Sequence, residues 1–261
     1  MNRFKILLVI IAFLVASCEE MDSLFKDKDT GLSEEEVVKG LKTALEVGSD
    51  TAVAVTSEVN GYYKDEAIKI MLPPEADIIY EHKDDASFQF LGLDQLIDDV
   101  VLSINRSAED AASEASPILK DAIVSLSIAD GWNILNGKNP ADTSNQEAAF
   151  DSTAATGYLI ATTYDELFDT FRPKINNSLK REWVGGVSTK QLWDDLTSTY
   201  NATAEPLGME TVDTELDVFV TEKALDGLFL KVANEEKEIR KDPAQWSGTL
   251  VEDILKKVFS S

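Results

Sequence analysis

Eight polar residues in two parts of the chain have side chains that could take part in chemistry. They are Asn105, Arg106 and Glu109 in the middle of the chain, and Thr221, Lys223, Asp226, Glu236 and Arg240 toward its end. Carboxylates can act as general acids or bases, and basic side chains can stabilise charge that develops on a substrate. The same residue types also form structural ion pairs, so each group has a functional and a structural interpretation.

Glu236 is the most informative of these residues because it falls on the apolar face of its helix. Apolar residues recur at three- and four-residue steps over Thr214–Lys241, which predicts one long helix. Thr214 followed by Asp217 predicts its capping box, and Glu236 lies near the centre of the apolar face. A carboxylate there should be paired, and Arg240 is one helical turn away. We expect Glu236 to be buried in a structural ion pair, with a ligand-contacting carboxylate as the alternative.

The group in the middle of the chain has the same helical spacing. The i, i+4 separation would pair Asn105 with Glu109 and Arg106 with Asp110 on one helix. These side chains either line a pocket or tie the helix to its neighbours, and structural ties of this kind are the more common case. We favour the structural interpretation.

Several reaction classes lack the residues they need. His82 is the only histidine and Cys18 the only cysteine, which disfavours serine or cysteine nucleophiles and zinc sites. The glycines of Gly131–Lys138 are spaced wrongly for a phosphate-binding loop. A formal charge of −24 argues against nucleic-acid binding. We therefore predict no catalytic constellation, no cofactor and no metal ion.

The first residues predict export and lipidation. Arg3 and Lys5 precede the apolar run Ile6–Val15, which is too short to span a bilayer. The small residues before Cys18 then resemble a bacterial lipobox. This predicts a signal peptide over residues 1–17, a lipidated Cys18 with a flexible tether to residue 31, and a domain over 32–261. The expected location is the cell envelope, on the periplasmic or surface face of the outer membrane, with the membrane as a partner through the lipid.

The domain is predicted to be all-α, with roughly eight to ten helices in a single globular unit. Capping signals at Ser33, Ser49, Ser116, Ser127 and Thr163 mark expected helix starts. The other expected helices are Leu93–Ala115, Ala148–Ala161, Ser188–Tyr200, Thr214–Lys241 and an amphipathic helix over Gly248–Phe259. No series of alternating strands is visible.

Several phrases together carry a resemblance to a known family. They are Asn105–Ala111, Ala129–Gly137, Ala154–Leu159, Val220–Phe229, Ile239–Pro243 and Leu255–Phe259. In this order the chain resembles exported bacterial proteins catalogued as domain of unknown function 4197, from about Gly31 to Phe259. The resemblance implies a fold and an exported location, and it implies no reaction.

Two hypotheses of function follow. The first is a non-catalytic, lipid-anchored binding or interaction module with an unknown protein or small-molecule partner. The second is a carboxylate enzyme, possibly dependent on a divalent cation. Its acids would be Glu109, Glu236 and Asp226, with Arg106, Lys223 or Arg240 as their basic partners. The enzyme requires these groups to converge on one concave pocket.

Overall fold

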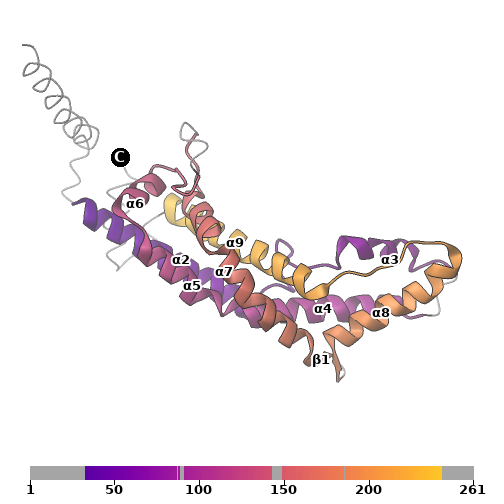
Figure 1. Cartoon of the computed structure of the whole chain (residues 1–261). Helices are drawn as coiled ribbons and strands as arrows, with labels where there is room; N and C mark the ends of the chain where they lie inside the picture. Colours follow the sequence, from indigo (N-terminus) through magenta and orange to yellow (C-terminus); the bar gives the residue numbers. More distant parts are fainter. Residues whose placement is uncertain (1–32, 87, 89–90, 143–148, 185, 243–261) are drawn as a thin grey trace, which may run out of the picture.

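The computed structural model describes residues 33–86, 88, 91–142, 149–184 and 186–242 (Figure 1). The helices are α2 (Glu34–Ser57), α3 (Asp77–His82), α4 (Leu93–Ala112), α5 (Ala115–Ser125), α6 (Ile128–Leu135), α7 (Ala154–Leu179), α8 (Thr189–Ala204) and α9 (Leu216–Lys241). Two 3-10 turns, η1 (Pro74–Ala76) and η2 (Glu205–Leu207), and a short hairpin of β1 (Glu182–Val184) and β2 (Val187–Ser188) complete the described part. The all-α prediction is confirmed. The predicted signal peptide, the tether and the Gly248–Phe259 helix lie outside the described residues.

Helix α9 packs against several other helices, as its periodic apolar residues predict. It contacts α7, α2 and α4, and its buried side chains include Val220, Leu225 and Leu228. Close approach depends on small residues at the crossings. A Cβ atom at Gly48 of α2 would lie 3.0 Å from Ile239 Cδ1, so glycine lets α2 lie close against the end of α9.

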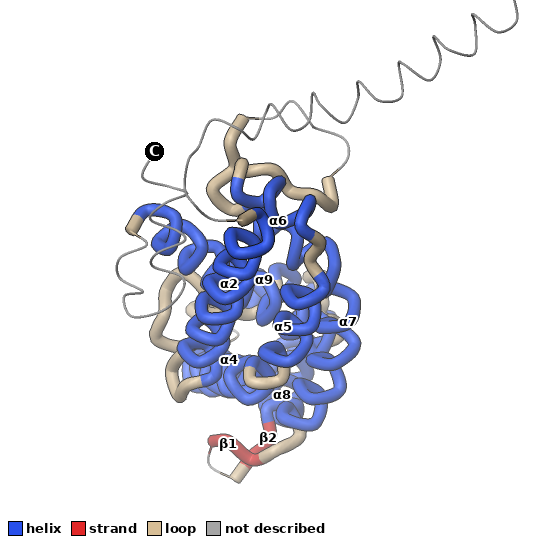
Figure 2. Tube along the Cα trace, turned by 90° about the vertical axis from the view of Figure 1, so that its left-hand side faces the viewer, coloured by secondary structure: helices blue, strands red, loops and turns tan. Residues whose placement is uncertain are grey.

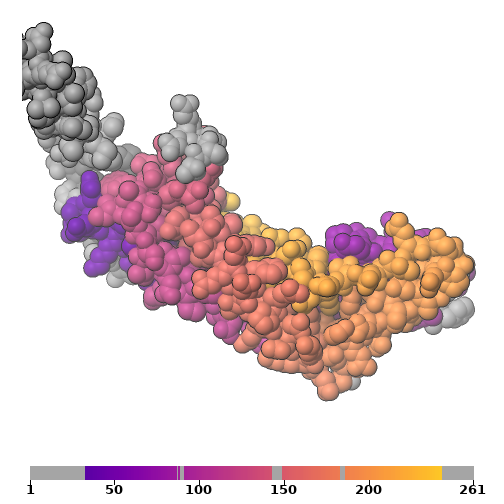
Figure 3. All heavy atoms as spheres, viewed as in Figure 1, coloured from indigo at the N-terminus to yellow at the C-terminus, as the bar shows by residue number. Residues whose placement is uncertain are grey.

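The molecule is elongated (Figures 1 and 3). Helices α2, α5, α6, α7 and α9 form a bundle, which Figure 2 shows turned by 90°. Helix α4 runs out of this bundle and packs against α8, with α3 alongside in an extension of the molecule. The β1–β2 hairpin joins α7 to α8 at the lower edge in Figure 1. The buried polar side chains of the bundle, described below, join α4 and α9 to α2, α6 and α7.

Two predicted helix breaks are wrong, because the serine and threonine expected as caps lie inside longer helices. Helix α2 is continuous through Ser49, which is buried at 3% exposure. Helix α7 is continuous through Thr163, whose Oγ1 donates to the carbonyl of Leu159 at 2.6 Å. A hydroxyl inside a helix can donate a hydrogen bond to a carbonyl of the preceding turn in this way. A capping motif alone therefore does not fix a helix start.

Two further predicted caps differ from the structure, and one small element was missed. Helix α5 begins two residues earlier than predicted, with Glu114 rather than Ser116 in the N-cap position, and the Ser116 hydroxyl donates to Asp50 instead of capping. Helix α9 begins at Leu216 after Glu215, and no side chain caps it. The missed element is the β1–β2 hairpin, whose strands of three and two residues are too short to show an alternation of apolar and polar residues in the sequence. The capping boxes at Ser33 and Ser127 are confirmed.

Candidate functional site: two buried clusters and an open cleft

Glu236 lies where the sequence predicts, and it is the centre of the Glu236 cluster (Glu236, Arg240, Ala155, Thr156 and Ile134). Its side chain is 4% exposed. Its Oε1 accepts from Arg240 Nη2 at 2.7 Å and from the Ala155 amide at 3.0 Å. Its Oε2 accepts from the Thr156 amide and the Thr156 hydroxyl, each at 2.8 Å. Both carboxylate oxygens are therefore fully engaged within the protein.

These contacts make Glu236 the cap of another helix. Ala155 and Thr156 belong to the first turn of α7, whose own N-cap residue makes no side-chain cap. First-turn amides have no partner within their helix, and the positive end of the helix dipole favours a carboxylate. Arg240 also donates to the carbonyl of Ile134 in the last turn of α6, at 2.9 Å. One ion pair of α9 thus fixes the ends of α6 and α7.

The Glu109 cluster (Asn60, Tyr62, Tyr63, Arg106 and Glu109) repeats this arrangement on α4. Glu109 is 4% exposed, and its Oε1 accepts from the amides of Tyr62 and Tyr63, each at 3.2 Å. Arg106 donates to Glu109 Oε2 at 2.6 Å and to Asn60 Oδ1 at 2.9 Å. The carboxylate therefore holds the turn that follows α2 against α4.

Tyr62 connects the Glu109 cluster to α9. Its hydroxyl donates to the carbonyl of Ala224 at 2.7 Å, and its ring lies against Gly227, where a Cβ atom would meet Cε1 at 2.7 Å. Burial, together with the nearby charge of Glu109, raises the pKa of the Tyr62 hydroxyl far above its ordinary value. The hydroxyl is therefore a permanent donor with a structural role.

Asn105 is fully buried but does not pair with Glu109, contrary to the prediction. Its Oδ1 accepts from the Ile70 amide at 2.9 Å, and its Nδ2 donates to the carbonyls of Ile70 and Val101, each at 2.7 Å. The amide thus satisfies the backbone of an extended segment the way a neighbouring strand would. Arg106 also does not pair with Asp110, which instead contacts Arg181 at 3.2 Å.

The remaining predicted residues lie apart from both clusters. The Thr221 hydroxyl donates to the carbonyl of Asp217 within its own helix at 2.7 Å. Lys223 and Asp226 form an exposed pair at 2.9 Å. The three acids of the enzyme hypothesis, Glu109, Glu236 and Asp226, therefore occupy separate places and do not share a pocket.

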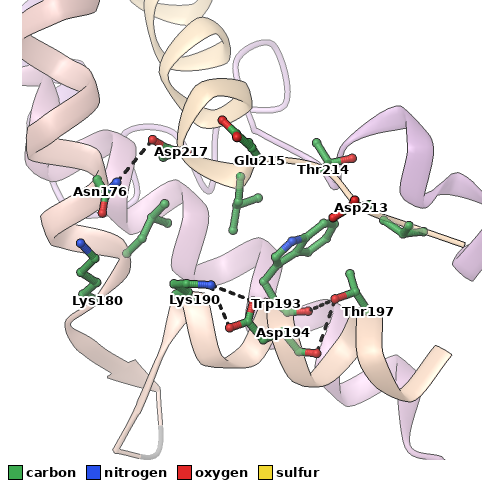
Figure 4. Close-up of a pocket in the computed structure, with 13 residues that line it drawn as sticks. Asn176, Lys180, Lys190, Trp193, Asp194, Thr197, Asp213, Thr214, Glu215 and Asp217 are labelled. Carbon is green, nitrogen blue, oxygen red and sulfur yellow. Dashed lines mark hydrogen bonds and ion pairs between the residues drawn. The ribbon is translucent and has the colours of Figure 1, made fainter. Parts of the chain in front are cut away.

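An open cleft, which we call the α9 cleft, lies where the end of α7, the start of α8 and the start of α9 meet (Figure 4). Its volume is about 420 Å³, within the range of roughly 300–1,000 Å³ common for small-molecule sites. The lining residues are Asn176, Leu179, Lys180, Lys190, Trp193, Asp194, Thr197, Val212, Asp213, Thr214, Glu215, Leu216 and Asp217. The cleft therefore combines an apolar floor with charges of both signs.

Charge pairs occupy part of the α9 cleft. Asp217 accepts from Arg172 Nε at 2.8 Å and from Asn176 Nδ2 at 3.4 Å. Burial alone would raise the pKa of Asp217, but the hydrogen bonds and charge of Arg172 outweigh it, so the pKa lies below its ordinary value. Lys190 pairs with Asp194 at 2.9 Å across one helical turn.

The sequence did not point to the α9 cleft. Lys180, Trp193 and Asp213 lie far apart in the chain, and none of them interrupts an apolar face. The nearest signals were the Gly185-Gly186 break and the loop that follows α8, which mark where elements turn but not which ones meet. Trp193 fits the apolar side of its helix, so periodicity alone assigns it to the core.

The described residues contain neither a candidate metal site nor a candidate membrane-spanning helix. No group of three or more histidine, cysteine or acidic side chains is placed to hold a metal ion within the described ranges. In that same part of the chain, no helix has the length and apolar character needed to cross a bilayer.

Comparison with known proteins identifies the family. The family model described as "Protein of unknown function (DUF4197)" matches residues 31–260, so the chain belongs to this family. The resemblance found in the sequence is thus confirmed over nearly the same range. No curated protein and no solved structure matches the chain.

Proposed function

We propose that this family member is a lipid-anchored protein of the cell envelope that acts as a non-catalytic binding module, with the α9 cleft as its ligand site. The proposal rests on a contrast: the two buried carboxylates are hydrogen-bonded within the protein, whereas the α9 cleft is open to solvent. Glu236 and Glu109 accept backbone amides and arginine donors inside the protein. Both carboxylates are 4% exposed and bonded to groups inside the protein, so the two most suggestive acids serve the fold.

Lipid anchoring rests on Cys18 and the residues before it. A lipid on Cys18 would put the membrane on the side where the domain begins. Helix α2 starts beside α6, since Val38 lies against Gly131, and the first turn of α7 is also at this end, because the Glu236–Arg240 pair bonds both α6 and α7. The α9 cleft is at the other end of α7, a separation of about 39 Å for a 26-residue helix. The cleft would then lie far from the point where the tether joins the domain, at the end of α7 that the anchor leaves free.

Native mass spectrometry of the protein, released gently from its own envelope, tests the binding role. We expect a small molecule bound to the wild-type protein and its loss in Trp193→Phe, which removes a polar group of the cleft and keeps an aromatic ring. Lys39→Ala, on the exposed face of α2, is the matched control and should keep the ligand. A bare protein, or a ligand that Trp193→Phe retains, would contradict the proposal.

Detergent partition tests the anchor separately. The wild-type protein should enter the detergent phase of a cloud-point extraction, and Cys18→Ser should move it to the aqueous phase, because the acyl chains supply the membrane affinity. A Cys18→Ser variant that still partitions into detergent would refute lipidation at this residue without bearing on the cleft.

A further inference from the structure

Three donors in the α9 cleft have no acceptor among the described residues. Trp193 is only 5% exposed, and its indole N–H has no hydrogen-bond partner. Figure 4 shows the indole among the lining side chains, between Lys190 and Asp213. The amides of Leu216 and Asp217, at the uncapped start of α9, also lack an acceptor. The three unpaired N–H groups are open to the cleft rather than sealed in the core, and two of them lie at a helix N-terminus, so this side of the cleft favours an anionic group.

Lys180 adds a positive charge to the same cleft. It follows the last residue of α7, is exposed, and makes no ion pair within the described part of the chain. The other lining lysine, Lys190, is held by Asp194. Of the two lining lysines, Lys180 can therefore bind an incoming carboxylate without breaking an existing ion pair.

Acidic side chains that line the same cleft favour a cationic group on the ligand. Asp213 is exposed and has no cationic partner among the described residues, and Glu215 is 77% exposed with Arg172 no closer than 3.5 Å. Asp194 and Asp217 are also present, although each already has a basic partner. A purely anionic ligand would meet four carboxylates, and a purely cationic one would leave the three donors unpaired.

We infer that the α9 cleft binds a small zwitterion, a molecule that carries a carboxylate and an ammonium group a few bonds apart. The carboxylate would lie against the Trp193 indole N–H, the first-turn amides of α9 and Lys180, and the ammonium against Asp213. Free amino acids and short peptides share this chemistry. The inference rests on the proposed function and names the ligand class of that same cleft.

Isothermal titration calorimetry with defined probes tests the ligand class. We expect one or more of the common L-amino acids, or a dipeptide such as alanylalanine, to bind the soluble protein (residues 19–261) with one-to-one stoichiometry. The deaminated and decarboxylated analogues of the best probe, propionate and ethylammonium in the case of alanine, should bind at least tenfold more weakly. Comparing amino acids with dipeptides distinguishes the two sources of the zwitterion.

Variants locate the binding and keep the test independent of folding. Lys180→Ala and Asp213→Asn change exposed side chains, and each should weaken binding of the best probe at least tenfold with an unchanged circular dichroism spectrum. Lys39→Ala should leave binding unchanged. Tight binding of an analogue with one charge, or a zwitterion that binds equally to both cleft variants, would overturn the inference.

The remaining outcomes separate this inference from the function on which it rests. If no amino acid or dipeptide binds, but the protein from its envelope carries another compound that Trp193→Phe loses, the zwitterion is wrong and the binding role stands. If neither experiment finds a ligand, both are wrong.

Discussion

Helices α7 and α9 each have 26 residues, but only the N-terminus of α7 is capped by a side chain. The first turn of α7 is closed by Glu236, a buried carboxylate from another helix. The first turn of α9 has no side-chain cap and opens onto a cleft. The charges that stand out most in this sequence are thus bonded within the fold, whereas the groups without partners lie at positions that the sequence pattern does not mark.

Removing the Glu236 carboxylate should have the largest effect on stability. Glu236→Gln places an amide against the first-turn N–H groups of α7 and leaves Arg240 buried without its counter-charge. Breaking such a pair typically costs about 3–5 kcal/mol. Urea unfolding followed by circular dichroism measures the loss. Glu235→Gln is the matched control, because burial raises the pKa of Glu235 and neutralising it should cost nothing. Equal stability of the two variants would refute the capping role of Glu236.

Asn105→Leu should have the next largest effect. The substitution keeps the branched shape of the side chain but leaves the amide and carbonyl of Ile70 without partners in the core. Two unsatisfied groups correspond to roughly 2–6 kcal/mol. Gln95→Leu is a matched control, since Gln95 is exposed and bonds only to the Asp99 side chain at 2.9 Å. A loss below about 1 kcal/mol for Asn105→Leu would mean that the extended segment is held by other contacts.

Acid should weaken the attachment of this same segment to α9. The hydrogen bond from Lys231 holds the pKa of Asp65 below its ordinary value of 3.8. A lowered folded-state pKa contributes stability above the unfolded-state value, and this contribution is lost as the pH falls through the folded-state pKa. Asp65→Asn should therefore destabilise the protein at pH 7 and reduce the further loss of stability below about pH 4. A parallel pH profile for both proteins would exclude this pair as a source of acid sensitivity.

Changes in the α9 cleft should have the smallest effect on stability. Lys180→Ala alters an exposed side chain without a partner among the described residues, so its effect should stay within about 0.5 kcal/mol. The same urea titration measures this, with Lys39→Ala beside it. A loss above about 2 kcal/mol would place Lys180 among the groups that hold the fold.

Periodicity predicted the parts of the fold that depend on local pattern. The long helix of α9, the burial of Glu236 and its pairing with Arg240 follow from spacing on one helix. The helix break predicted at Ser49 is absent. Tertiary packing continues α2 through this serine, although a serine could have capped a new helix. The backbone groups that Asn105 and Glu109 bond in the segment after α2 lie 35 to 47 residues away, and one sequence contains no signal for such contacts. The α9 cleft is unpredictable for the same reason.

Amide hydrogen exchange measured by NMR tests the central contrast most directly, because both helix starts are observed in one sample. The amides of Ala155 and Thr156 are bonded to a buried carboxylate, and those of Leu216 and Asp217 are not bonded to the described residues. Without ligand, the α7 pair should exchange at least about 100-fold more slowly than the α9 pair, a difference of about 2.7 kcal/mol. Glu236→Gln should remove the difference. Similar exchange at both helix starts in the wild-type protein would contradict the account.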